Sequence, residues 1–319
     1  MPNASKILFV SWEVADWRML HPLLDAGHLP NLNRLVDRGV IAEPTPAANP
    51  HTFANGQGLD ETELNPAFKP IWQDLADAGR RCVAMRWPGS HPAVALPNGG
   101  VVVSDLFRLE ALPRTPAAEG TVAPARHREV LENLRLHPSE LGIEDVRAFV
   151  PELDGLPPEQ QQPVQWLAGA LADTATTHNG AIHLLTSEPW DFAAIPYTAL
   201  SAICQQFLQF ARVEVAPTSP FRQVAATAWV LADNLLGRLL EIAGPDATVF
   251  VGSSMGILGT PVAVLAGPGI REDERLDVSA GQPSAADIVP TLRWLAGLPD
   301  DPKFPGKPWK QAATDTAVV

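Results

Sequence analysis

The sequence has few cysteines, no long apolar segment and no cluster of basic residues. Its 2 cysteines, Cys82 and Cys204, lie far apart in strand-like and helix-like segments, which argues against a disulfide framework and predicts two buried thiols. No apolar run approaches the ~18 residues that a membrane-spanning helix needs. The run Ile7–Val10 is also too short for a signal peptide. These absences predict a cytoplasmic protein.

The balance of charge is acidic. The 319 residues include 36 Asp and Glu but 23 Lys and Arg, giving a net charge of −13. Nucleic-acid backbones and anionic membrane surfaces are bound by cationic faces, so the sequence predicts neither as a partner. The hydrophobic fraction of 46% is enough for the core of one large α/β domain, with or without a cap.

Short apolar runs alternate with segments of helical periodicity. In Gln223–Ala243 the apolar residues recur every three or four positions, which predicts an amphipathic helix. Continuous apolar runs predict strands that are buried on both faces. The alternation predicts an α/β fold with a mostly parallel sheet and helices on both faces. The predicted strands are Ile7–Val10, Arg81–Trp87, Gly100–Ser104, Asp191–Tyr197, Ala247–Gly252 and Pro261–Ala266, and the other predicted helices include Asp16–Leu24, Leu32–Asp37, Phe68–Ala78 and Ala285–Leu295.

The middle of the chain differs from its two ends. Between residues 109 and 189, Pro, Gln and Glu become more frequent, and helical patches appear without strong strands. We interpret this segment as a helical cap inserted into an α/β core made of residues 1–108 and 190–311. The small, polar residues 312–319 are predicted to form a frayed tail.

Several segments, taken in order, resemble one protein family. They are Lys6–Trp17, Trp87–Pro92, Val101–Asp105, Ala266–Ile270 and Asp287–Leu292. Together they resemble the alkaline-phosphatase superfamily in its type I phosphodiesterase/nucleotide pyrophosphatase branch. The resemblance implies an alkaline-phosphatase-like sheet with two divalent metals at its C-terminal edge and a Thr or Ser nucleophile between them. Such metals lower the pKa of the nucleophile and stabilise charge on the phosphoryl oxygens.

At the positions where the family holds metal-binding Asp and His, this chain carries other residues. The resemblance places Glu13 at the end of the first strand, and places a nucleophile at either His51 or Thr52. The remaining ligand positions fall on Ser201, Gln205, Ser254 and Met255. Hydroxyl, amide and thioether groups cannot replace carboxylates and imidazoles at a dinuclear site. We therefore predict no metal and no other cofactor, and expect Glu13, Thr52, Ser201, Gln205, Ser254 and Met255 to line one cleft.

Three functions are compatible with these residues. The first is a non-catalytic binding or interaction protein, a pseudoenzyme whose partner is a small molecule in the former cleft, an active paralogue or a second copy of itself. The second is a metal-independent enzyme or small-molecule binder that reuses the cleft. The third, which we rank last, is a metal-dependent phosphodiesterase or phosphatase. His178 and His183, spaced five residues apart, are predicted to be surface residues because that spacing suits no helical metal pair.

Overall fold

The computed structural model describes residues 4–46, 69–108, 113, 115–211, 218–276, 281–304 and 306–314. These residues form a nine-stranded sheet in the order β5-β4-β3-β6-β1-β7-β8-β2-β9. The strands are β1 Lys6–Ser11, β2 Gly39–Ala42, β3 Cys82–Trp87, β4 Val101–Ser104, β5 Val122–Ala123, β6 Phe192–Pro196, β7 Ala247–Gly252, β8 Ala263–Ala266 and β9 Glu274–Arg275.

The centre of the sheet is parallel. Strand β1 lies between β6 and β7, and both neighbours run parallel to it. Strands β3 and β4 extend the parallel part beyond β6. Antiparallel pairs occur towards the edges, where β5 joins β4 and where β8 lies between β7 and β2. The predicted α/β class with a mostly parallel sheet is therefore confirmed, with antiparallel pairs towards both edges.

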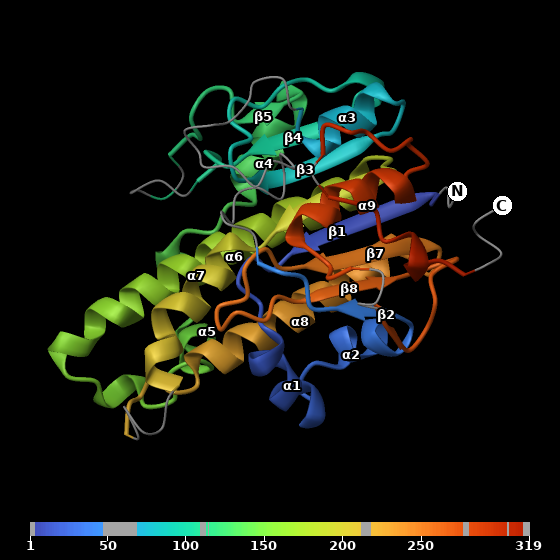
Figure 1. Cartoon of the computed structure of the whole chain (residues 1–319). Coiled ribbons are helices and arrows are strands. Elements are labelled where there is room, and N and C mark those ends of the chain that lie inside the picture. The colour runs from blue at the N-terminus through green and yellow to red at the C-terminus, as the bar shows by residue number, and fades with distance from the viewer. Residues whose placement is uncertain are drawn as a thin grey trace.

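Helices cover both faces of this sheet (Figure 1). Side chains alternate along a strand, so Leu8 and Val10 of β1 join one core while Ile7 and Phe9 join the other. The first core is covered by α1 Trp17–Asp25, α2 Pro30–Asp37, α6 Gln161–Ser187, α7 Thr198–Phe207 and α8 Val224–Ala243. The second core is covered by α3 Ile71–Asp77 and α9 Ile288–Leu295. The short helices α4 Arg128–Asn133 and α5 Ile143–Arg147 lie near α6.

Helices α2 and α8 are joined closely. A Cβ atom added at Gly237 of α8 would lie 2.6 Å from Asn31 Nδ2, so only glycine allows this approach. Asn31 Nδ2 donates to the backbone oxygen of Asp233 at 3.1 Å and to its carboxylate at 2.9 Å. The side chain of Asp233 is completely buried. Helix α2 is thereby fixed against α8 by polar contacts as well as by apolar packing.

The segment 109–189, expected as a helical insertion, contributes to the sheet as well as to its cover. Its strand β5 pairs with β4, and its long helix α6 contacts β3, α7 and α8. The expected helical patches are present, with α6 extending over 27 residues. Whether these residues act as a separate cap remains a prediction.

The C-terminal residues are packed further than expected. Ala312 and Ala313 are buried, and Ala313 forms an isolated bridge with Ile270. Residues 312 and 313, the first two of the tail that was expected to fray, are therefore packed against the fold.

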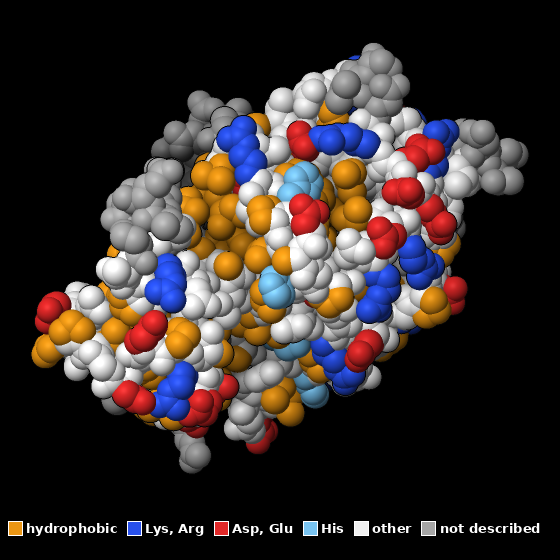
Figure 2. Space-filling model, turned by 90° about the horizontal axis from the view of Figure 1, so that it is seen from below, with side chains coloured by type: hydrophobic (Ala, Val, Ile, Leu, Met, Phe, Trp, Pro, Cys, Tyr) orange, Lys and Arg blue, Asp and Glu red, His pale blue; other side chains and the backbone are white. Residues whose placement is uncertain are grey.

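Charges are mixed on the face of the molecule seen in Figure 2. Lys and Arg side chains are interspersed there with Asp and Glu rather than gathered in one basic field. Among the residues described, no helix is both long enough and apolar enough to cross a membrane.

Candidate functional site

The C-terminal ends of β1 and β7 meet at the edge of the sheet where the sequence places the candidate cleft. After β1 the backbone carbonyl of Glu13 accepts three hydrogen bonds from the turn that follows β7. Ser253 Oγ donates at 2.9 Å, Ser254 Oγ at 3.3 Å and the amide of Met255 at 3.3 Å. Both serine side chains are buried, and Met255 is half-buried. The structure thus places Ser254 and Met255 at the backbone carbonyl of Glu13, and the lining of one cleft by their side chains stays a prediction.

The carboxyl group of Glu13 is half-buried at this edge. Burial raises its pKa from 4.5 to about 7, because the charged form is poorly solvated there. At neutral pH a substantial fraction of Glu13 is therefore protonated. Such a carboxyl can give or take a proton under ordinary conditions, but it is a weaker metal ligand than an ionised one.

The C-terminal end of β6, which lies beside β1, is followed by the only tyrosine of the sequence. Tyr197 follows β6, and its amide donates to the carbonyl of Ser11 at 3.0 Å, which places it beside the end of β1. One helical turn later Ser201 is also buried, and its Oγ has no hydrogen-bond partner among the described residues. Gln205, a further turn along α7, is exposed. Ser201 is thus buried and Gln205 is exposed, whereas the sequence predicts that both side chains line the cleft.

Tyr197 forms a hydrogen bond that the sequence did not predict. Its hydroxyl lies 2.7 Å from Nδ1 of His178, which projects from the middle of α6. Burial lowers the pKa of His178 to about 4, with a further contribution from the charge of Arg238, so the imidazole is neutral at pH 7. Burial also raises the pKa of Tyr197. His178, predicted to lie on the surface, is half-buried, because Tyr197 at the N-cap of α7 gives its ring a partner inside the fold.

The loop between β7 and β8 is held by Asp16, the N-cap residue of α1. One carboxylate oxygen accepts from the amide of Arg18 at 2.9 Å. The other accepts from the amides of Leu258 and Thr260 at 2.7 and 2.9 Å. Asp16 is completely buried and all of these donors are backbone groups, so its carboxylate fixes the loop.

The residues described at this edge do not fit a dinuclear metal site. In the part of the chain that the structure describes, no three His, Cys, Asp or Glu side chains come together in a way that could hold a metal ion. Ser253 and Ser254 direct their hydroxyls to a backbone carbonyl, the carboxyl of Glu13 is partly protonated at neutral pH, and the carboxylate of Asp16 is occupied by backbone amides. The predicted nucleophile candidates His51 and Thr52 lie outside the described residues.

The whole chain resembles solved structures of hydrolases. A 2-O GAG sulfatase superposes with a TM-score of 0.59 and 12% identity, over 96% of this chain and 73% of that one. The inactive murine ectonucleotide pyrophosphatase/phosphodiesterase 5 in complex with AMP gives 0.54 and 12%, over 97% and 100%. The phosphonate monoester hydrolase from Silicibacter pomeroyi gives 0.55 and 15%, over 99% and 78%. All three are members of the alkaline-phosphatase superfamily.

The chain has the alkaline-phosphatase fold. No family model matches the sequence, and no curated protein matches it either. At identities of 12–15% these structures show a shared architecture only. The chemistry of this chain depends on its own residues. On the alkaline-phosphatase fold the candidate cleft is the C-terminal edge formed by β1, β6 and β7.

Sequence reasoning missed Tyr197, His178 and Asp16 at this site. The signal for Tyr197 is its place directly after a buried strand, where ligands commonly bind in parallel sheets. Nothing local signals His178, since its partner is 19 residues away and on another helix.

Proposed function

We propose that this protein is a non-catalytic member of its fold group, acting as a binding or interaction protein without two-metal phosphoryl or sulfuryl transfer. The observation that carries the proposal is the use of Ser253 and Ser254, whose buried hydroxyls donate to the carbonyl of Glu13. Groups engaged in this way hold two strand ends together. As neutral hydroxyls they do not supply the negative charge of the carboxylate ligands at a divalent metal site.

The test combines metal analysis with activity measurements on the full chain. We expect purified protein to contain less than a tenth of an equivalent of zinc or manganese. We also expect no hydrolysis of bis(4-nitrophenyl) phosphate or 4-nitrophenyl sulfate above the uncatalysed rate when either metal is added. Stoichiometric metal that is lost in Glu13→Gln, accompanied by turnover, would overturn the proposal.

A designed variant provides the positive control. Ser254→Asp combined with Met255→His places a carboxylate and an imidazole at the end of β7, where this chain has a hydroxyl and a thioether. We expect this double variant to bind zinc measurably more tightly than the natural sequence. Equal and tight zinc binding by both proteins would mean that metal is held by other residues.

The alternative is a metal-independent enzyme, and the protonation of Glu13 supports it. A carboxyl with a pKa of about 7 is suited to general acid–base catalysis near neutral pH. Ser254, and His51 or Thr52 outside the described residues, are the further candidates for such a reaction. A hydrolytic activity that persists in EDTA, follows a pKa near 7 and disappears in Glu13→Gln would favour this function over the first.

The proposed partners are a small molecule in the cleft, an active paralogue or a second copy of the chain. We also propose a cytoplasmic location, supported by two free and buried cysteines, Cys82 and Cys204. Pull-down from the native organism with the tagged full chain, followed by size-exclusion chromatography, distinguishes a paralogue complex from self-association.

A further inference from the structure

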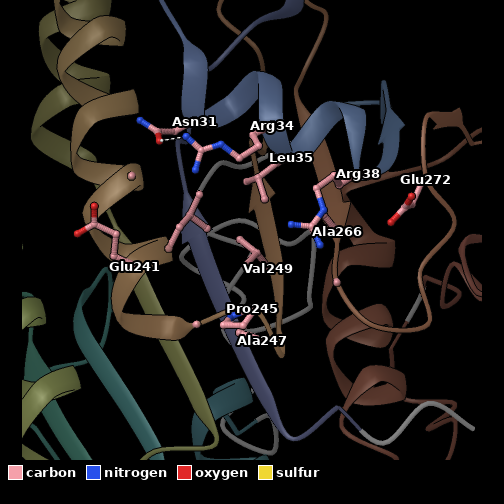
Figure 3. Close-up of a pocket in the computed structure, with 14 residues that line it drawn as sticks. Asn31, Arg34, Leu35, Arg38, Glu241, Pro245, Ala247, Val249, Ala266 and Glu272 are labelled. Carbon is pink, nitrogen blue, oxygen red and sulfur yellow. Dashed lines mark hydrogen bonds between the residues drawn. The ribbon is translucent and has the colours of Figure 1, made fainter.

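A hollow lies at the opposite end of strand β7 from the candidate cleft. It has a volume of about 340 Å³ and is enclosed by α2, the C-terminal half of α8, the start of β7 and the end of β8 (Figure 3). Strand β7 runs from Ala247 at the hollow to Gly252 at the cleft. At roughly 3.3 Å per residue, the two sites are about 17 Å apart along that strand. This edge pocket is therefore distinct from the cleft.

The floor of the edge pocket is apolar. Leu35, Ala247, Val249 and Ala266 line it and are each at least nine-tenths buried. Gly244 and Gly267 add backbone without side chains around the same hollow. A volume of this size, with an apolar floor, matches the dimensions of sites for small organic ligands.

Two arginines stand on one wall. Arg34 and Arg38 are one turn apart on α2, and Figure 3 shows Leu35 lying between them above Val249. Arg34 makes a long contact of 3.5 Å with Asn31 Oδ1. Figure 3 shows the Arg34 side chain extending to Asn31, whereas the Arg38 guanidinium points over the hollow. The guanidinium of Arg38 can bind both oxygens of one carboxylate, with the apolar part of the ligand on the floor below.

Acidic groups limit the charge of the ligand. Glu241 lines the pocket on α8, but its carboxylate is paired with Arg238 at 2.8 Å. Glu272 lies on the far side, beyond Arg38. A second negative charge on a ligand would meet Glu272, so these charges favour one anionic group rather than two.

We propose that the edge pocket binds a small aromatic or alicyclic monoanion, with its carboxylate at Arg38 and its ring on Leu35 and Val249. This inference does not depend on the proposed function, since it concerns other residues at the other end of strand β7. It identifies a ligand class for a surface that the two-metal chemistry of the fold does not use.

The test uses two probes of equal shape. Naphthalene-2-carboxylate and naphthalene-2-carboxamide differ in charge but hardly in size. In calorimetric titrations of the full chain we expect the carboxylate to bind at least about tenfold more tightly than the amide. Arg38→Gln should reduce carboxylate affinity about tenfold and leave amide affinity unchanged. The control Arg222→Gln alters an exposed arginine away from the pocket and should have no effect.

Chemical-shift mapping locates the bound probe. We expect the carboxylate to shift the amide resonances of Gly244 and Gly267, which line the edge pocket, and to leave Gly256 at the cleft unchanged. Equal affinity for the two probes, an Arg38→Gln protein that binds as the natural one does, or shifts confined to Gly256 would each overturn the proposal.

Discussion

Asp233 caps a helix to which it does not belong. Its carboxylate, buried in the middle of α8, accepts a hydrogen bond from the backbone amide of Leu32 at 2.7 Å, in the first turn of α2. The second oxygen accepts from the amide of Asn31 at 3.1 Å. The N-cap residue of α2 is Leu29, which has no side-chain oxygen to offer. The free amides at the start of α2 are therefore satisfied from the neighbouring helix.

Replacing this carboxylate should destabilise the protein strongly. In Asp233→Ala two backbone amides and the side chain of Asn31 lose a buried acceptor, and we expect the free energy of unfolding to fall by about 2–4 kcal/mol. Asp233→Asn keeps one acceptor and should cost less. Urea unfolding measures both, with the exposed Asp246→Ala as control, which should change stability by less than about 0.5 kcal/mol. A loss in Asp233→Ala no larger than in the control would contradict this account of α2.

The raised pKa of Glu13 predicts a particular dependence on pH. Between the ordinary pKa of 4.5 and the folded value of about 7, the folded protein holds a proton that the unfolded chain has released. The contribution of Glu13 therefore becomes less favourable as pH rises through this window, by on the order of 3 kcal/mol in total. Glu13→Gln removes the titration and should gain stability relative to the natural protein between pH 5 and 8. Glu129→Gln, at an exposed position, serves as control. A stability difference between Glu13→Gln and the natural protein that stays constant with pH would be incompatible with a buried carboxyl.

His178 should have the opposite effect. Its folded pKa of about 4 lies below the ordinary 6.5, so the unfolded chain binds a proton first as pH falls. Its contribution to stability is present above pH 6.5 and is lost towards pH 4. Since Glu13 and His178 act in opposite directions over overlapping ranges, the natural protein should show a flatter profile than either single variant. Unfolding of His178→Leu across pH 4–7 measures the histidine alone, and a profile identical to that of the natural protein would contradict its burial.

The hydrogen bond between His178 and Tyr197 can be measured by a double-mutant cycle. We expect a coupling energy of about 1 kcal/mol from Tyr197→Phe, His178→Leu and the double variant, because both groups are neutral and shielded from water. Additive losses would show that the bond of 2.7 Å contributes nothing to stability.

Asp16 should control the mobility of the loop after β7. In Asp16→Ala the amides of Leu258 and Thr260 lose their acceptor, so their hydrogen exchange should accelerate by at least about tenfold. The exposed residue Asp25 lies on the same helix, and Asp25→Ala provides the comparison. Exchange that is unchanged in Asp16→Ala would mean that the loop is held by its own turns.

The sequence was sufficient for the elements whose signal is local. Strand β7 was predicted with its bounds, and α8 to within one residue, because a continuous apolar run and a long periodic stripe define them. Strand β2 was missed, since Gly39–Ala42 is four residues long and is a strand only through its pairing with β8. Strands β5 and β9 have two residues each and give no periodicity to detect.

The candidate cleft itself stays a prediction. Glu13, Ser254 and Met255 were expected near one another because parallel strands end at one edge, and Ser254 and the amide of Met255 do contact the backbone carbonyl of Glu13. What those side chains do there was not predictable. The donation of two serine hydroxyls to one backbone carbonyl depends on the turn geometry after β7 and on the path of the chain after β1.

The close junction of α2 with α8 has a consequence for the energetics of any ligand in the edge pocket. Because Gly237 admits Asn31 and Asp233 holds the start of α2, the wall that carries Arg34 and Arg38 is already fixed. Binding would then restrict the side chain of Arg38 rather than a helix, and the entropy cost would stay small. Such a wall implies that calorimetry of ligand binding will show a negative heat-capacity change with little ordering of the backbone.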